Sequence, residues 1–398
     1  MKAKSVLKRV LCLAMLLLIC CIYGCAEKND LSAGIYPQGP PSEMPKLPEN
    51  SVFSLDLGSL SATQKNNLKT ELLISEMSLE QKIGQLFFAR VPAKNKLEDL
   101  RTFHLGGYIL FGRDTAGKTV STLSEEISAF QQASDFPLVI GVDEEGGSVV
   151  RLSSNKNLRH SRFKSPQALF AEGGMEKIVS DTAEKDALLD LVGINVNLAP
   201  VADVSVSPDD FIYERSFGKG AKETAEYVES VVSQMSSDGI GSVLKHFPGY
   251  GSNADTHTGS SVDTRSLESF RQSDFLPFKA GFSAGGKTVA VMVSHNVMTC
   301  VDSKNPASLS PAVHNILRNE LGFDGVIMTD DLAMDAVKGY DCPALAAIKA
   351  GNDMVICTDY KTQIPAVLQA VKKGIVSEDI INDAVRRVLG WKISLGLI

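Results

Sequence analysis

The sequence predicts a (β/α)8 barrel, in which eight parallel strands, each followed by a helix, close into a cylinder. After residue 66, short runs rich in β-branched residues alternate with amphipathic stretches. The strand-like runs number eight, which is the count that closes such a barrel. The roughly 330 residues after this point show no change of composition that would divide them into two domains. We therefore expect one large α/β domain.

From the second predicted strand onward, strands and helices alternate. The strand-like runs are residues 86–91, 107–111, 138–142, 196–201, 243–246, 289–294, 325–329 and 354–357. The helical patterns are residues 121–133, 175–191, 221–237, 267–284, 311–321, 343–350 and 364–373. A doubly wound sheet is the alternative, but it would carry a glycine-rich turn after its first strand. No G-x-G-x-x-G follows Val91, which favours the barrel.

The first 24 residues have the pattern of a secretory signal peptide. Four basic residues between Lys2 and Arg9 precede an uncharged run from Val10 to Tyr23. This run is shorter than the roughly 20 apolar residues that span a bilayer. The run ends in Ile-Tyr-Gly-Cys25, which resembles the bacterial lipobox; a plain signal peptide with a coincidental cysteine is the alternative. We expect cleavage before a lipidated Cys25. The expected location is the cell envelope, either lipid-anchored on the outer side of the cytoplasmic membrane or in the periplasm.

The composition then divides the chain. Residues 25–66 are rich in Pro, Ser, Asn and Lys, which predicts a lipidated Cys25 followed by a flexible tether. The predicted organisation is a signal peptide over 1–24, the tether over 25–66 and a single barrel domain over 67–398.

Charge and cysteine content exclude several classes of function. Without the basic leader, the chain carries 36 basic and 47 acidic residues, a formal charge of −11, which disfavours a nucleic-acid partner. Cys300, Cys342 and Cys357 have neither zinc spacing nor a disulfide framework. We interpret them as packing residues and leave a Cys342–Cys357 bridge open. The sequence predicts no metal site and no cofactor.

Polar side chains follow four of the predicted strands. They are Asp143 with two glutamates, Lys245-His246, His295-Asn296 and Asp330-Asp331. In a barrel of this kind the active site lies at the C-terminal ends of the strands. A strand-end Asp often caps the next helix and a single His is often a core residue, but four such positions in register predict a functional site.

The segment after the fifth predicted strand carries the strongest local signal. Lys245-His-Phe-Pro-Gly249 fixes a tight exit from the strand, and a polar loop follows. In an extended segment Asp255 and His257 project from the same side. A carboxylate there would orient the imidazole and make it a proton carrier near neutral pH. The alternative is a cap by Asp255 with an exposed histidine.

These motifs are similar to those of glycoside hydrolase family 3. Lys245-His-Phe-Pro-Gly, Asp255-Thr-His and Gly325-Val-Ile-Met-Thr-Asp-Asp-Leu-Ala-Met carry the resemblance. Residues 140–151, 197–203 and 214–218 support it, and it runs from about Met77 to the C-terminus. More narrowly, the chain resembles bacterial β-N-acetylglucosaminidases that act on peptidoglycan fragments.

The resemblance implies roles for individual residues in a retaining glycosidase. Asp330 corresponds to the nucleophile, and His257 with its partner Asp255 to the general acid/base. The implied substrate-binding residues are Asp143, Arg151, Arg215, Lys245 and His246.

Structural alternatives exist for several of these positions. Asp143 and Arg151 could form an ion pair, and Arg215 could fix its own loop. Asp331 is interpreted as structural, and His295 lies at the expected rim but outside the matching motifs. Tyr250 departs from the family pattern, where a second histidine is common.

The expected activity is removal of terminal β-linked N-acetylglucosamine from a glycan or muropeptide. A phosphorylase or a β-glucosidase of the same family is an alternative, because a neutral imidazole also admits phosphate as acceptor. A metal-dependent hydrolase would need a His-x-His pair after the first strand, which reads Phe87-Phe-Ala-Arg-Val91 instead. A non-catalytic sugar-binding lipoprotein would need stacking aromatics, but the one tryptophan, Trp391, is far in sequence from every motif.

Overall fold

A computed structural model describes residues 60–253 and 261–398. Cys25, Asp255 and His257 lie outside the described residues. The chain divides into two compact units, residues 1–72 and 73–398, and the first is described from Leu60 to Leu72. Among the helices of the described part, none is both long enough and apolar enough to cross a membrane.

Within the described residues, eight parallel strands form one sheet in the order β10-β1-β2-β3-β4-β5-β7-β9. A parallel bridge between Met328 and Met354 joins the two outer strands of that order, so the sheet closes into a barrel. This confirms the predicted (β/α)8 fold. A separate parallel pair, β6 (Val262–Asp263) with β8 (Val297–Met298), lies outside the barrel sheet. The barrel strands are β1 (Phe87–Arg90), β2 (Gly107–Leu110), β3 (Val139–Val142), β4 (Val196–Asn197), β5 (Gly241–Phe247), β7 (Val289–Val293), β9 (Val326–Thr329) and β10 (Val355–Cys357).

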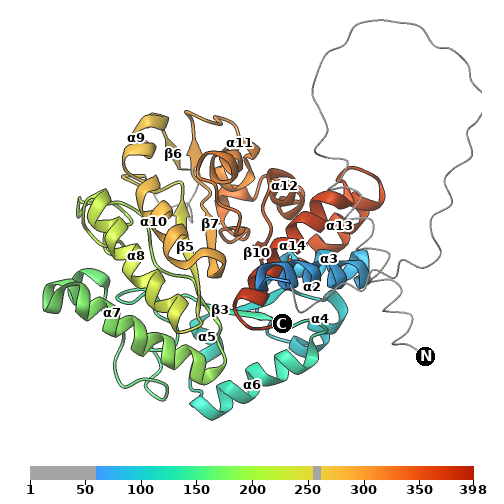
Figure 1. Ribbon diagram of the computed structural model, residues 1–398, viewed down its shortest axis with the longest axis horizontal. Helices are drawn as coiled ribbons and strands as arrows, with labels where there is room; N and C mark the ends of the chain where they lie inside the picture. The colour runs from blue at the N-terminus through green and yellow to red at the C-terminus, as the bar shows by residue number, and fades with distance from the viewer. Residues whose placement is uncertain (1–59, 254–260) are drawn as a thin grey trace, which may run out of the picture. The chain divides into compact units, whose positions relative to one another are not determined.

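Helices follow the strands and surround them, as α6, α7, α8 and α10 show in Figure 1. The α-helices are α2 (Ala62–Glu76), α3 (Leu79–Gln85), α4 (Lys96–Phe103), α5 (Gly112–Thr115), α6 (Val120–Ala133), α7 (Pro166–Val192), α8 (Ala221–Ser237), α9 (Leu267–Gln272), α10 (Phe275–Gly285), α11 (Pro311–Asn315), α12 (Pro343–Ala350), α13 (Tyr360–Lys372) and α14 (Glu378–Ser394). Short 3-10 turns are η1 (Gly286–Thr288), η2 (Ala307–Leu309) and η4 (Asp335–Val337), and η3 (Ile316–Glu320) is a π-helix.

Three boundaries differ from the sequence predictions. The tether was expected to reach residue 66, but α2 begins at Ala62. The helix expected over 267–284 is two helices, because Ser273 leaves helical geometry between α9 and α10. The helix expected from residue 175 begins at Pro166, where Ser165 caps its first turn, and it kinks at Gly173–Gly174.

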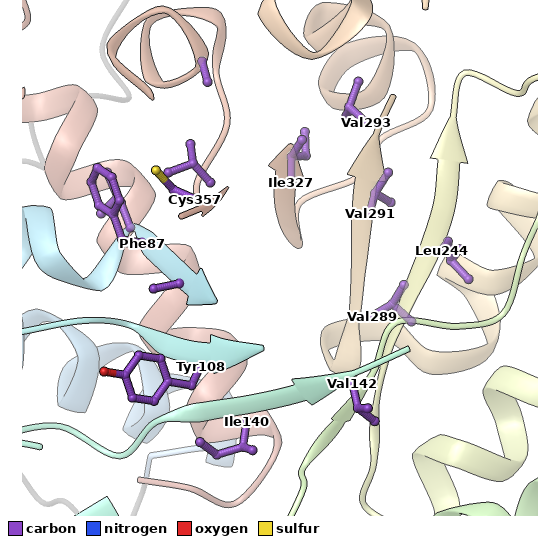
Figure 2. Packing of buried hydrophobic residues seen from close by; sticks show 14 of the residues in the cluster. Phe87, Tyr108, Ile140, Val142, Leu244, Val289, Val291, Val293, Ile327 and Cys357 are labelled. Atoms are coloured by element: carbon purple, nitrogen blue, oxygen red, sulfur yellow. The ribbon is translucent and has the colours of Figure 1, made fainter. Parts of the chain in front are cut away.

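Alternate strand residues separate into two apolar clusters, as the period of two in a strand requires. Phe88, Ile109 and Met328 belong to the cluster inside the barrel. Their neighbours Phe87, Tyr108 and Ile327 belong to the larger cluster between strands and helices. In Figure 2 the side chains of this outer cluster lie on successive strands and extend toward the helices.

Side chains fill the barrel interior so closely that one position, Gly141, has no room for a side chain. A Cβ on Gly141 would lie 2.4 Å from the ring carbon Cζ of Phe88, so any larger residue at this position would displace the aromatic ring. The end of the barrel interior at which the strands begin is closed by α14, whose Trp391 belongs to the inner cluster. The Trp391 indole N–H donates to the carbonyl of Thr288, the residue before β7.

One buried carboxyl group lies where α7 packs on α8. Asp186 is 1% exposed, and the carboxyl group of Asp238 lies near its own. Burial raises the pKa of Asp186 to about 8, and the negative charge of Asp238 contributes in the same direction. The folded protein therefore holds this proton at neutral pH.

Asp186→Asn is expected to raise the thermal midpoint more at pH 9 than at pH 5. The folded-state pKa lies above the unfolded value of 3.8, so the native state loses stability as pH rises from about 4 to about 8. Asparagine removes the ionisation, and with it a penalty on the order of 5 kcal/mol at high pH. Thermal melts across this range check it, with Asp190→Asn on the exposed face of the same helix as control. A pH-independent difference between Asp186→Asn and the native protein would contradict the assignment.

Candidate active site

The C-terminal ends of the barrel strands bring together residues that are far apart in sequence. Asp143 follows β3, Lys245 and His246 lie on β5, and Asp330 follows β9. Asp330 is placed by its backbone N–H, which donates to the carbonyl of Val293 at the end of β7 (2.9 Å). These residues therefore share the rim at which barrels of this type hold their active sites.

A buried charge network occupies one side of the rim. The Nζ atom of Lys245 lies 2.7 Å from Asp143 Oδ1 and 2.5 Å from Glu145 Oε1, and its side chain is 2% exposed. Arg215 donates to both oxygens of Glu145, from Nε (3.0 Å) and Nη2 (2.8 Å). Although burial opposes ionisation, Arg215 and Lys245 hold the pKa of Glu145 well below its usual value. Glu145 thus stays ionised and fixes both cations.

The protonation of His246 follows from its neighbours. Arg215 Nη2 lies 3.3 Å from His246 Nε2, and a guanidinium can only donate, so Nε2 is an acceptor. The ring proton is then on Nδ1, which lies 2.8 Å from Asp203 Oδ2. Asp203 also accepts from the backbone N–H groups of His246 and Tyr250. A neutral, oriented imidazole therefore faces Arg215 across the rim.

A buried carboxylate orders the loop after β3. Glu144 is fully buried and accepts from the backbone N–H groups of Arg151, Leu152 and Ser153. This places the Arg151 guanidinium 3.6 Å from Asp143 Oδ2, measured from Nη2. Arg151 Nε is buried and has no hydrogen-bond partner among the described residues. Arg151 therefore keeps donor capacity next to Asp143.

Asp330 is followed by a carboxylate with a different function. The Asp331 N–H donates to Asp330 Oδ1 (2.8 Å), and its own carboxylate binds Arg90 at the end of β1 and caps the Ala333 N–H (2.9 Å). Burial raises the pKa of Asp331, and the pairing with Arg90 opposes that rise. The Arg90 guanidinium also lies over the Phe111 ring, 4.4 Å from its centroid.

The described residues on both sides of the gap at 254–260 are tied together. Arg265 donates to the carbonyl of Gly249 and pairs with the buried carboxylates of Asp263 and Asp274. Asn253 Nδ2 donates to Asp263 Oδ2 at 2.5 Å. Gly249 has a φ of +119°, and a Cβ there would lie 2.3 Å from Asp274 Oδ1, so only glycine fits. This anchor holds the two ends of the segment that carries Asp255 and His257, which themselves stay predictions.

Most of the residues expected from sequence meet at this rim, but with partners that sequence did not reveal. The structure contains the Asp143–Arg151 ion pair that was considered as an alternative. Lys245 and Arg215, expected as substrate-binding residues, both pair with Glu145. Sequence reasoning assigned no role to Asp203, Glu145 or Arg90. A signal existed for each, since Asp203 and Glu145 lie inside motifs already quoted and Arg90 ends the first strand.

The described residues show no metal-ligand cluster, since no group of three or more His, Cys, Asp or Glu within 60–253 and 261–398 is placed to hold an ion. Cys300, Cys342 and Cys357 are free thiols, and the bridge left open between the last two is absent. Cys342 Sγ instead lies 3.2 Å from Gln363 Oε1.

Comparison with known proteins places the chain in a family. Residues 78–390 match the glycosyl hydrolase family 3 N-terminal domain. Beta-hexosaminidase LpqI of Mycobacterium tuberculosis is 31% identical in an alignment 332 residues long that covers 79% of this chain and 83% of that protein.

Solved structures agree with this match. A glycoside hydrolase family 3 beta-N-acetylglucosaminidase from a Paenibacillus species superposes with a TM-score of 0.75 at 30% identity, over 81% of this chain. The present chain spans 63% of the length of that enzyme. A beta-N-acetylhexosaminidase from Beutenbergia cavernae gives 0.71 at 29% identity, over 79% of this chain and 98% of the other. The chain therefore belongs to glycosyl hydrolase family 3.

Proposed function

We propose that the protein is a retaining exo-β-N-acetylglucosaminidase that removes terminal β-linked N-acetylglucosamine. The observation that carries this proposal is the convergence of Asp330 with the Asp143–Lys245–Glu145–Arg215 network at the C-terminal rim of the barrel. The similarity to proteins named beta-hexosaminidase and beta-N-acetylglucosaminidase supports the choice of sugar.

The proposed reaction has two steps. In the first, a carboxylate oxygen of Asp330 attacks the anomeric carbon, the glycosidic C–O bond breaks, and His257 gives its proton to the leaving oxygen. In the second, His257 removes a proton from water, which attacks the same carbon and releases Asp330. Two inversions give net retention of the β configuration. Asp255 would orient the His257 ring and stabilise its charged form.

The charge network supplies the binding groups for the sugar in this proposal. Asp143 is held from two sides by Lys245 and Arg151, so its carboxylate is fixed to accept hydrogen bonds from sugar hydroxyls. The partly exposed Arg151 guanidinium and the ammonium of Lys245 would donate to hydroxyl or acetamido oxygens. Arg215 and His246, locked by Glu145 and Asp203, would form the adjacent wall. Such prearranged polar groups favour the transition state because they need no reorganisation during reaction.

We also propose that the natural substrate is a peptidoglycan fragment, and that the mature chain is anchored in the cell envelope through a lipid on Cys25. The support is the signal-like N-terminus, the lipobox-like Cys25 and the acidic mature chain. Activity that stays with membranes in the native chain and becomes soluble in Cys25→Ala would be the expected outcome. Activity in the soluble fraction for both would reject the anchor.

A substrate comparison tests the activity. We expect a nitrophenyl β-N-acetylglucosaminide to be hydrolysed at least about 10²-fold more efficiently than the matching β-glucoside, because a site built to bind the acetamido group leaves polar groups unpaired without it. Proton NMR should show the β-anomer of N-acetylglucosamine first. Preference for the glucoside would identify a β-glucosidase, initial α-anomer would exclude retention, and a phosphate-dependent sugar 1-phosphate would identify a phosphorylase.

A further inference from the structure

His295 is a fully buried histidine at the rim whose two ring nitrogens both have polar contacts. It follows β7, and its Nδ1 lies 2.7 Å from the hydroxyl of Ser308 in η2. Its Nε2 lies 3.1 Å from the backbone carbonyl of Asp331. A carbonyl oxygen only accepts, so Nε2 carries a proton and donates a hydrogen bond to the Asp331 carbonyl.

The Asp331 residue thereby becomes a fixed connector between His295 and Asp330. Its carbonyl is held by His295, its carboxylate by Arg90, and its N–H donates to Asp330 Oδ1 at 2.8 Å. The contact at Oδ1 limits rotation of the Asp330 carboxylate about its Cβ–Cγ bond. The orientation of that carboxylate is thereby coupled to the plane of the Asp330–Asp331 peptide. The contact of His295 with the Asp331 carbonyl helps to hold the adjoining Asp331 backbone.

We propose that His295 is a positioning residue for the nucleophile, acting through the Asp331 backbone on the Asp330 carboxylate. This inference rests on the proposed role of Asp330. It assigns His295 no contact with the sugar and no proton transfer. Its effect belongs to the step in which Asp330 attacks, where a displacement of about 1 Å is enough to cost about 10²-fold in rate.

Two substitutions separate the contacts of His295. In His295→Gln the side-chain amide can reach the position of Nε2 and still donate to Asp331. In His295→Asn the shorter amide can reach the position of Nδ1, so it keeps the contact with Ser308 and loses that with Asp331. With a dinitrophenyl β-N-acetylglucosaminide, whose leaving group needs no proton, we expect kcat/KM to fall about 10²-fold for His295→Asn and less than about tenfold for His295→Gln.

The control is a second buried histidine away from the rim. His314 on α11 is 3% exposed, and its Nδ1 lies 2.8 Å from the carbonyl of Ser310. His314→Gln should lower the thermal midpoint and leave kcat/KM per active site unchanged. Ki for the product N-acetylglucosamine should be the same in all variants, because positioning of Asp330 affects attack rather than ground-state binding. Active sites are counted by the stoichiometry of covalent trapping with a fluorinated glycosyl fluoride.

Arg90→Met gives an independent arm of the test, which remains available if the His295 variants do not fold. Arg90 is partly exposed, and its replacement removes the ion pair that holds the Asp331 carboxylate. A fall in kcat/KM with unchanged Ki is expected here too. The inference is overturned if His295→Asn keeps at least half of the native kcat/KM, if His295→Gln loses as much as His295→Asn, or if folded Arg90→Met is fully active. Full activity of Asp330→Asn would instead reject the proposed nucleophile itself, whatever the His295 variants show.

Discussion

Replacing Asp330 by asparagine is expected to lower turnover of an aryl β-N-acetylglucosaminide on the order of 10⁴-fold or more. The amide is nearly the same size as the carboxylate and keeps an oxygen for the Asp331 N–H, so the fold and the local contact survive. It is a poor nucleophile and lacks the negative charge that stabilises the developing oxocarbenium ion. The loss should appear in both kcat and kcat/KM, because the missing interaction is made at the reacting carbon.

Chemical rescue makes the Asp330 result specific. In Asp330→Gly, azide can enter the vacated space, form a C–N bond on the face that the carboxylate occupied, and expel the leaving group to give the α-glycosyl azide. Asp335→Asn, an exposed acid in η4, is the matched control and should retain native activity. Native turnover by Asp330→Asn would reject the nucleophile. A native protein that is inert on every β-N-acetylglucosaminide but still binds the sugar would support the non-catalytic sugar-binding alternative.

Replacing His257 by alanine is expected to separate substrates by their leaving groups. General acid catalysis contributes about 10²–10⁴-fold, and a leaving group that departs as a stable anion does not need it. We expect a loss of about 10³-fold for an alkyl glycoside or a disaccharide and less than about tenfold in the first step for a dinitrophenyl glycoside. Steady-state and burst kinetics on the two substrate types measure the difference.

The same experiment has an internal control and a clear contrary outcome. Asp255→Asn should show a weaker form of the same leaving-group dependence, since it removes the orienting charge and leaves the imidazole in place. His160→Ala, at an exposed position, should behave as native on both substrates. Equal losses on good and poor leaving groups in His257→Ala would argue against a proton-donor role. The loss of activity would then come from a change in structure or in substrate binding.

The strands were the most predictable part of the fold because burial on both faces makes them short and β-branched. Val289–Val293 and Val326–Thr329 are read almost directly from the sequence. Helix boundaries were harder to predict. Gly173 and Gly174 interrupt the apolar periodicity of α7, so its start was expected at residue 175 rather than at Pro166, where the helix begins. The break between α9 and α10 depends on the conformation of Ser273, which has no distinctive sequence signal.

At the candidate site, sequence predicted positions but not partners. Asp143, Lys245 and Asp330 follow strands, and strand ends in a closed parallel barrel share one rim, so their proximity follows from topology. Which carboxylate Lys245 binds depends on the path of the loop after β3, and that path is set by the buried Glu144 and its three backbone donors. Contacts of this kind join residues whose spacing carries no periodic signal, so they become visible only in three dimensions.

The placement of Trp391 has a practical consequence for how this protein can be observed. The sequence contains one tryptophan, and its indole donates to the carbonyl of Thr288, just before β7, whereas Asp330 is tied to Val293 at the end of that strand. Intrinsic indole fluorescence therefore reports on the closed base of the barrel, with the length of β7 between it and the rim. Emission will follow global unfolding and will be largely insensitive to a sugar at Asp330, so ligand binding needs an extrinsic or calorimetric signal.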